Sequence, residues 1–304
     1  MNQEYINTVR LLLAIAPSVF KSPRFAMKGG TALNLFIQDM PRLSVDIDVV
    51  FTDYTLDRAN ALQAIASDLE AVRTAIARMG YRARVPTGRS EDDVKLLVEA
   101  EGSQVKVEAN FVFRGTVLPI KRTPLSAVAQ DLFTTQMEIP VLDESELYGS
   151  KLVAAMDRQH PRDIFDVMKM LEMFGWQESF IDCFVAYLAG HNRPVHEVLF
   201  PRKRPLEPIF ANEFSGMTRE PIELAVLQRV QDRLITELPT RLTDDHRAFL
   251  LSLVQADPRW DLMPFEHLEH LPALQWKLTN LTALRTRNRP RFEAQYEFLV
   301  RQLR

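Results

Sequence analysis

Two hydrophobic patterns alternate along the first part of the chain. Apolar residues recur every three or four positions over residues 7–20 and 56–79, which predicts two amphipathic helices. Between them, residues 45–51 alternate apolar and polar side chains and then become wholly apolar, as in a strand that enters a core. Before this strand, the Gly-Gly-Thr sequence at residues 29–31 predicts a turn, and a short helix is expected over residues 32–36.

Four further segments have the pattern of strands. They are residues 95–99, 104–113, 117–120 and 137–142. The sequence Glu-Gly-Ser at residues 101–103 separates the first two, and a short glycine-containing connection predicts a hairpin. In the second segment, Val105 and Val107 share one face, whereas Lys106 and Glu108 share the other.

After residue 143 the pattern is helical. The segments with helical spacing are residues 144–157, 162–174, 177–189, 221–238, 243–255, 274–285 and 291–303. Four prolines and a basic run at residues 202–204 predict a linker or surface loop over residues 194–208. The expected organisation is an α/β domain over residues 1–143 and an all-helical domain over residues 144–304.

The composition is that of a soluble globular protein, with 46% hydrophobic and 25% charged residues. The formal net charge is −3, so a nucleic acid could be bound only by a local basic patch. Cys183 is the single cysteine, which excludes an intrachain disulfide or thiolate zinc site and predicts plain core packing. No apolar run approaches the length of a membrane span and no secretory signal is recognised, so the cytoplasm is the expected compartment.

Candidate chemistry begins with Asp46 and Asp48. On a strand their side chains project to the same side, about 7 Å apart. Two carboxylates this close repel each other unless a cation lies between them, and Mg²⁺ takes such oxygen ligands where phosphates complete its shell. Two solvent-facing acids at a sheet edge are the alternative interpretation.

Two nearby features favour the metal interpretation. Gly29 and Gly30 precede a helix, and backbone N–H groups made accessible by glycine bind phosphate oxygens. Glu108 could supply a third carboxylate if its strand lies beside that of Asp48. Each feature alone has an ordinary interpretation, a turn for the glycines and a surface position for Glu108.

A third feature lies in the helical part. Asp163 and Asp166 are three residues apart, so they share a face of the helix that Pro161 begins. Lys151 lies among apolar residues of the preceding helix. It could extend to solvent, or it could bind a nucleotide phosphate with Asp163 or Asp166 orienting it.

These residues resemble the motifs of a known family. Lys-Gly-Gly-Thr-Ala-Leu at residues 28–33 and Arg-Leu-Ser-Val-Asp-Ile-Asp at residues 42–48 look like the signature of the AbiEii-type nucleotidyltransferases. Lys151 and Arg-Asp-Ile-Phe-Asp at residues 162–166 look like the second conserved block of that family. The family comprises toxins of type IV toxin–antitoxin systems and belongs to the polymerase-β-like superfamily.

The resemblance implies an α+β fold, namely a minimal polymerase-β-like nucleotidyltransferase domain with a mixed sheet and flanking helices, followed by an all-helical C-terminal domain. It implies transfer of a nucleoside monophosphate from a nucleoside triphosphate (NTP), with Mg²⁺ or Mn²⁺. In the better-understood relatives the acceptor is a tRNA 3′ end, so such a toxin blocks translation. A cognate antitoxin is a further expected partner, and no membrane is expected.

The matched positions imply roles for individual residues. Asp46 and Asp48 would be metal ligands, and Glu108 is the third carboxylate expected from strand alternation. The triphosphate would lie at the positions Lys28, Gly29, Gly30, Thr31, Ser44 and Arg162. Lys151 and Asp166 match the essential lysine and later aspartate of the family, and Asp163 joins them as a catalytic candidate.

Other functions stay open on the sequence alone. A protein hydroxyl could replace tRNA as the acceptor, as in protein AMPylation. The chain could also be a non-catalytic interaction module that keeps the fold, or a metal-dependent phosphohydrolase with the same carboxylates. Residues 277–304 carry seven basic residues against two acidic ones, which could steer RNA or form a solvated helix face.

Overall fold

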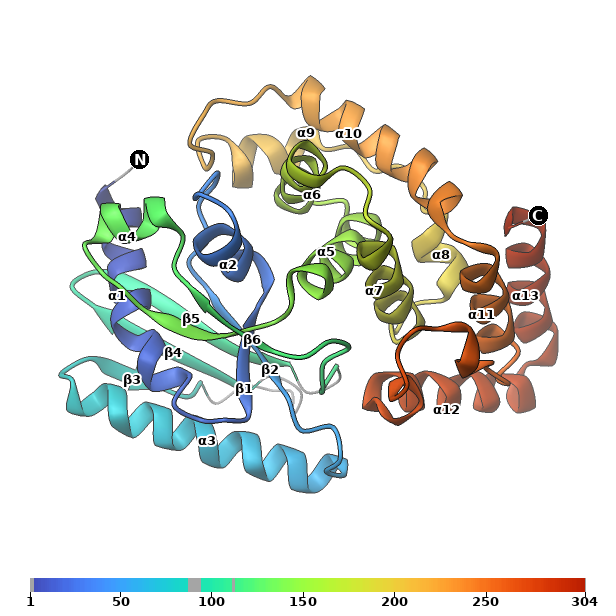
Figure 1. Cartoon of the computed structure of the whole chain (residues 1–304), viewed down its shortest axis with the longest axis horizontal. Helices are drawn as coiled ribbons and strands as arrows, with labels where there is room; N and C mark the ends of the chain where they lie inside the picture. Colours follow the sequence, from blue (N-terminus) through green and yellow to red (C-terminus); the bar gives the residue numbers. More distant parts are fainter. Residues whose placement is uncertain (1–2, 87–93, 111–112, 304) are drawn as a thin grey trace. The chain divides into compact units, whose positions relative to one another are not determined.

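The structure is a computed structural model of the chain. It describes residues 3–86, 94–110 and 113–303. Internal contacts divide the chain into two compact units (Figure 1). The first unit comprises Met1–Leu147 and Gly216–Glu220, and the second comprises Tyr148–Ser215 and Pro221–Arg304.

The first unit is built on a seven-stranded mixed sheet with the strand order β3-β4-β5-β2-β1-β7-β6. The strands are β1 (Phe25–Lys28), β2 (Ile47–Phe51), β3 (Arg82–Arg84), β4 (Val94–Ala100), β5 (Ser103–Asn110), β6 (Lys121–Pro124) and β7 (Glu138–Val141). β2 pairs parallel with β5, and β1 pairs parallel with β7, while the other neighbours are antiparallel. The expected mixed sheet is therefore present.

Helices pack on this sheet because each has an apolar side. They are α1 (Gln3–Val19), α2 (Gly29–Ala32) with a π-helical turn (Leu33–Ile37), α3 (Arg58–Arg78) and α4 (Ala127–Phe133). α1 contacts both β5 and α3, whereas α2 contacts β1 and β2. Val9, Leu12 and Ile15 of α1 are fully buried, which confirms the helical periodicity of this segment.

The β4–β5 hairpin forms at the predicted place. Glu101 and Gly102 have φ angles of 47° and 82°, and Ala100 pairs with Ser103. Two central residues with positive φ match the right-handed twist of the strands, which is why glycine is favoured there. The predicted strand extends to residue 113, but residues 111–112 lie outside the described part of the chain.

The predicted strand over residues 117–120 is wrong. The strand in this region is β6, which begins at Lys121. The backbone N–H groups of Val117 and Leu118 donate to the Glu146 carboxylate, at 2.8 and 3.0 Å. A side chain thus satisfies the donors that a strand partner would otherwise take.

A short later segment completes the first unit. The N–H of Leu43 donates to the carbonyl of Met217 at 2.8 Å, and the N–H of Arg219 donates to that of Pro41 at 2.9 Å. Gly216–Glu220 therefore belongs to the first unit through an isolated bridge between Arg42 and Thr218, although the chain reaches it only after residue 215.

The second unit is helical. Its helices are α5 (Glu144–Arg158, which starts in the first unit), α6 (Pro161–Phe174), α7 (Glu178–Ala189), α8 (Val195–Leu199), α9 (Glu207–Ile209), α10 (Leu224–Glu237), α11 (Asp244–Val254), α12 (Pro272–Arg287) and α13 (Arg289–Leu303). The predicted helices occur at the expected places, while the predicted loop over residues 194–208 also contains α8 and the start of α9.

Close helix packing explains one buried glycine and the single cysteine. A Cβ added to Gly149 would lie 2.5 Å from the Cβ of Cys183, so only glycine allows α5 and α7 to approach this closely. Cys183 is fully buried, and its interpretation as a core residue is confirmed. Within the described residues, no helix has the length and hydrophobicity needed to cross a membrane.

Candidate active site

The glycine turn lies directly against Asp48. Gly29 ends the extended path of β1 and opens α2 with a φ of +79°, a conformation that favours glycine. A Cβ at this position would be 2.2 Å from Oδ2 of Asp48. The missing side chain thus allows the Asp48 carboxylate to approach the backbone at the start of α2.

Gly30 is close to two polar side chains. A Cβ added there would meet the Arg42 guanidinium at 2.7 Å and the Ser44 hydroxyl at 3.0 Å. Asn34 fixes this turn, because its Nδ2 donates to the carbonyl of Gly30 at 2.8 Å and its Oδ1 accepts the N–H of Arg42 at 3.2 Å. The turn therefore presents its backbone beside a guanidinium and a hydroxyl.

A chain of hydroxyl groups connects this turn to Asp46. Thr31 Oγ1 donates to the carbonyl of Asp46 at 2.5 Å, and it lies 2.9 Å from Ser44 Oγ. Since Thr31 has one hydroxyl hydrogen and the carbonyl can only accept, Ser44 must be the donor to Thr31. Tyr5 holds Ser44 from the other side by accepting its N–H at 2.8 Å and donating to its carbonyl at 3.3 Å.

Strand register aligns four charged residues across the sheet. Lys28 pairs with Asp48, Asp48 pairs with Glu108, and Glu108 pairs with Lys95. The predicted condition for Glu108, that its strand lies beside that of Asp48, is therefore met. Glu108 accepts from Lys106 at 2.8 Å and from Lys95 at 3.2 Å, so lysines surround the paired acids.

The pKa shifts follow from this arrangement. Desolvation lowers the pKa of the Lys28 ammonium, although Asp48, Glu146 and Glu108 oppose that shift. Burial raises the pKa of Glu108, but hydrogen bonds from Lys106 and Lys95 outweigh it and hold the pKa below its usual value. Glu108 therefore carries its negative charge at neutral pH.

The donor set around Asp46 and Asp48 fits a hard divalent cation. Both side chains offer only oxygen ligands, and the glycine turn places backbone close to one of them. Among the residues that the structure describes, no three His, Cys, Asp or Glu side chains form a ready-made cluster for a metal ion. Substrate oxygens would therefore have to complete the ligand shell of an ion held by the two aspartates.

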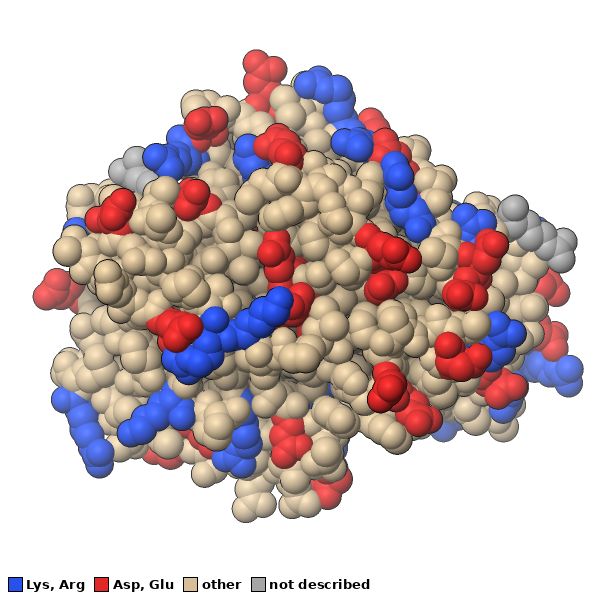
Figure 2. Space-filling view, viewed as in Figure 1, with Lys and Arg blue, Asp and Glu red and all other residues tan. Residues whose placement is uncertain are grey.

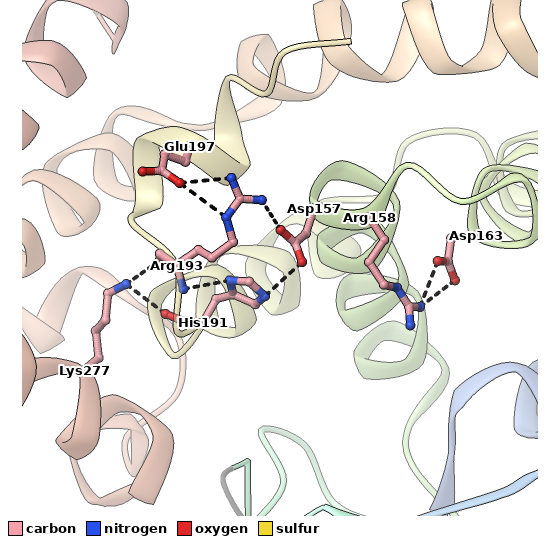
Figure 3. Close-up of polar contacts among 7 residues, drawn as sticks. All are labelled: Asp157, Arg158, Asp163, His191, Arg193, Glu197 and Lys277. Atoms are coloured by element: carbon pink, nitrogen blue, oxygen red, sulfur yellow. Dashed lines mark hydrogen bonds and ion pairs between the residues drawn. The ribbon is translucent and has the colours of Figure 1, made fainter. Parts of the chain in front are cut away.

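Lys151 is buried in the second unit between two acids. Its Nζ lies 2.9 Å from Oδ1 of Asp163 and 3.0 Å from Oδ2 of Asp166, and all three side chains are at most 8% exposed. Arg158 also binds Asp163, at 2.8 Å, from an exposed position (Figure 3). The interpretation of Lys151 as a solvated surface lysine is therefore wrong.

Arg162 lies apart from this buried group. Its guanidinium is 4.0 Å from Glu213, and its side chain is 42% exposed. Glu213 also contacts His160, whose Nδ1 accepts the N–H of Arg162 and so caps α6. A structural role for His160 at this helix start is clear, whereas a role of Arg162 in nucleotide binding stays a prediction.

Three residues of the first unit escaped the sequence analysis. Asn34 follows Gly30 by four residues in a helical segment, so a bond to that carbonyl could have been anticipated. Arg42 belongs to the same signature segment as Ser44, and its 4% exposure is an unusual property for arginine. Tyr5 gave no signal, because 39 residues separate it from Ser44.

Known proteins resemble this chain at two levels. The family model described as "Nucleotidyl transferase AbiEii toxin, Type IV TA system" matches residues 10–280. The solved structure of MenT4, a nucleotidyltransferase toxin from Mycobacterium tuberculosis H37Rv, is similar with a TM-score of 0.60 and 18% sequence identity. The match covers 92% of this chain and 95% of MenT4, which shows the fold. No curated protein matches the sequence.

Proposed function

The chain belongs to the AbiEii family of nucleotidyltransferase toxins of type IV toxin–antitoxin systems, and from this premise we propose that it transfers a nucleoside monophosphate from an NTP to a tRNA 3′ end. The observation that carries the proposal is the packing of the Gly29 backbone against the Asp48 carboxylate. Such a transfer would block translation in the cytoplasm, where NTPs and tRNA occur. A cognate antitoxin would restrain it.

The glycine turn is the proposed binding site for the triphosphate. Backbone N–H groups at the start of α2 and the ammonium of Lys28 provide donors suited to phosphate oxygens. Thr31 and Ser44 are proposed to hold the turn in place for the triphosphate, because their hydroxyl hydrogens already lie in hydrogen bonds within the site. Tyr5 is proposed to act indirectly, because its two hydrogen bonds to the Ser44 backbone orient that residue.

Asp46 and Asp48 would hold Mg²⁺ or Mn²⁺, with substrate oxygens completing the ligand shell. Glu108 is proposed as a third carboxylate that lies beside Asp48 in the strand register, and not as part of a ready-made metal cluster, because no three acids form one in the described part of the chain. When bound, such an ion neutralises phosphate charge and orients the phosphates for in-line displacement. Lys95 and Lys106 both contact Oε1 of Glu108 and hold its carboxylate ionised.

Lys151, Asp163 and Asp166 are proposed to be required for transfer, on the basis of the family resemblance and their buried geometry. The two acids orient the ammonium of Lys151, which is a point charge of the kind that binds phosphates. Arg162 is proposed as a further phosphate contact, since much of its side chain is exposed.

Transfer of label tests the proposal directly. Purified protein is incubated with magnesium and NTPs labelled in the nucleoside, together with total tRNA or with cell protein. We expect label in the tRNA pool for the wild type and a loss of about 10²-fold or more for Asp48→Asn. Asp131→Asn is the matched control. It replaces an exposed acid of α4, alters the net charge by the same amount as Asp48→Asn, and should keep full activity.

Three outcomes would contradict the proposal in different ways. Label in cell protein alone would show protein nucleotidylation. Release of free nucleotide that requires Asp48, with no labelled acceptor, would indicate a phosphohydrolase. Equal results for the wild type and Asp48→Asn in all pools would leave only a non-catalytic module.

A further inference from the structure

A proline-flanked basic loop in the second unit has no part in the proposed chemistry. It comprises Pro201, Arg202, Lys203, Arg204 and Pro205, and it follows α8. All three cations are exposed. A run of this kind is ordinarily a flexible, solvated segment, so the conformation of its backbone decides whether it can do more.

Buried Gln159 holds the backbone of this basic loop. Its Nε2 donates to the carbonyl of Arg202 at 2.8 Å, and its Oε1 accepts the N–H of Arg204 at 2.9 Å. Strand ladders pair with the C=O of one residue and the N–H of the residue two further on in the same way, so we infer that residues 202–204 are extended. The amide of Gln159 therefore pairs with the loop as a neighbouring strand would.

Gln231 of α10 completes the clamp. Its Nε2 donates to Gln159 Oε1 at 2.7 Å and to the carbonyl of Arg204 at 2.9 Å. The arrangement has costs, because Gln159 has a φ of +51° and the Oε1 of Gln231 is buried with no hydrogen-bond partner in the described part of the chain. Two glutamines that are 2% and 1% exposed thus order a surface loop at the expense of stability.

The ordered loop leaves two guanidinium groups available. In extended backbone, side chains two residues apart project to the same side. Arg202 and Arg204 therefore share one side of the loop, while Lys203 projects to the other and pairs with Asp232. Within the residues that the structure describes, neither arginine forms an ion pair, in contrast to Lys203.

We propose that Arg202 and Arg204 bind two phosphates of an RNA backbone, with Gln159 and Gln231 holding them in place before RNA arrives. This inference rests on the proposed function, since RNA is the proposed acceptor. Planar guanidinium groups bind phosphates through two parallel N–H···O bonds, and an ordered loop loses little entropy on binding. On the face that Figure 2 shows, acidic and basic side chains are interspersed, so a local feature must supply the contact.

The salt dependence of tRNA binding tests this inference. The full chain carrying Asp48→Asn is used so that no nucleotide transfer alters the RNA, and its affinity for total tRNA is measured between about 50 and 200 mM salt. Adding Arg202→Gln and Arg204→Gln should reduce the slope of log affinity against log salt by about 1.4 to 1.8. The affinity of this variant should therefore differ less from that of the parent at the higher salt than at the lower salt.

Two matched variants sharpen the result. Arg287→Gln with Arg291→Gln removes the same charge from exposed positions in the basic C-terminal stretch and should leave the slope unchanged. Gln159→Gly keeps every charge and accommodates the positive φ, but it releases the loop. It should weaken binding about three- to tenfold with an unchanged slope, because only the prior ordering is lost.

Several results would overturn the inference without touching the proposed function. They are an unchanged slope for the Arg202 and Arg204 variant, an equal loss for the Arg287 and Arg291 variant, or unaltered affinity for Gln159→Gly. Equally strong binding of polyglutamate at the same loop would assign it to an acidic protein instead. Conversely, a wild type that fails to label tRNA but shows the predicted slopes would overturn the proposed function alone.

Discussion

At Gly29 two physical demands coincide. Its φ of +79° favours glycine, and any Cβ would overlap the Asp48 carboxylate at 2.2 Å. Either demand alone could be met by a small local shift. Together they tie the conformation of the turn to the position of a proposed metal ligand, so a change at Gly29 must disturb the carboxylate as well as the backbone.

Gly29→Ala should therefore cost both stability and activity. We expect a loss of about 1–3 kcal/mol in the free energy of unfolding from backbone strain, together with a large loss of nucleotidyl transfer. Urea unfolding and label transfer measure the two effects. Gly80→Ala is the matched control, because Gly80 also has a positive φ, +89°, but no atom lies within 4 Å of an added Cβ. Full activity in Gly29→Ala would contradict the coupling to Asp48.

Variants of Lys151 and its two buried acids can separate an effect on folding from an effect on catalysis. Lys151→Met leaves Asp163 and Asp166 buried without their shared ammonium, and breaking a buried ion pair costs about 3–5 kcal/mol. Adding Asp166→Asn removes one of the two buried carboxylate charges and should restore part of that stability. Chemical denaturation of both variants measures this recovery.

Activity then decides the role of Lys151. If the ammonium acts on a phosphate, nucleotidyl transfer should be absent in Lys151→Met and also in the double variant with recovered stability. Transfer that returns together with stability would show that Lys151 is purely structural. Equal stability of the two variants would contradict the ion-pair explanation.

Residue types predicted part of this site. Asp46, Asp48 and Glu108 could be proposed from alternation along strands, and the register of Asp48 with Glu108 agrees. Tyr5 could not, because its bond to Ser44 depends on how α1 packs on the sheet. The burial of Lys151 was likewise missed, since the sequence shows the acids but not how deeply they lie.

On the scale of secondary-structure elements, α12 is joined to the loop between α7 and α8 by one buried lysine. Lys277 donates to the carbonyls of His191 and Arg193, at 2.8 and 2.6 Å, and Arg193 in turn bridges Asp157 and Glu197 (Figure 3). Burial lowers the pKa of Lys277 to about 8, although Glu197 opposes the shift.

The stability of the protein should depend on pH through Lys277. Its pKa is about 8 in the folded chain and about 10.5 when unfolded, so between these values the unfolded chain binds more protons. The contribution of Lys277 to the free energy of unfolding should therefore begin to rise as the pH passes its folded-state pKa of about 8. Between pH 7 and 9 we expect a rise of about 1 kcal/mol. Urea unfolding at both pH values measures this rise.

Lys277→Met is the control for this pH dependence. The methionine side chain cannot titrate, so the free energy of unfolding of this variant should rise less between pH 7 and 9 than that of the wild type. Burial lowers the pKa of the nearby His191 and His196 below 6.5, so both remain neutral over this range and do not obscure the result. An identical pH dependence in wild type and variant would contradict the assignment.

Helices were easier to predict than strands for a physical reason. α3, α6 and α7 have apolar faces long enough to define their period, and their predicted bounds differ from the observed ones by at most two residues. β1 was missed, because its four residues are too few to show alternation before the glycines. The predicted strand at residues 117–120 is absent because the N–H of Val117 donates to Glu146, a contact with a residue distant in sequence that no local pattern indicates.

At the scale of the whole molecule, the chain order does not follow the division into units. Gly216–Glu220 belongs to the first unit, although the residues on both sides of it belong to the second. The sequence offered no signal for this return, because it depends on backbone pairing with residues 41–43. Each unit has its own apolar core. A ligand that binds within the first unit should therefore stabilise that unit against unfolding.

Nucleotide binding should raise the melting temperature only when the proposed metal ligands are present. A ligand at 100 times its Kd stabilises the folded state by about 2.7 kcal/mol, which corresponds to several degrees for a chain of this size. We therefore expect NTP with magnesium to shift the unfolding of the wild type upward, and chelation of the metal to abolish most of the shift. Asp46→Asn with Asp48→Asn should abolish it as well, because the pair that holds the ion is then uncharged.

The matched control for this shift is Asp39→Asn with Asp131→Asn, which removes two exposed acids from the same unit. It changes net charge equally, so a general electrostatic attraction of NTP would affect both double variants alike. A normal shift in the control and none in the Asp46 and Asp48 variant would locate the nucleotide at the glycine turn. A shift that persists in the latter, or in the presence of chelator, would contradict a metal-assisted site at these two aspartates.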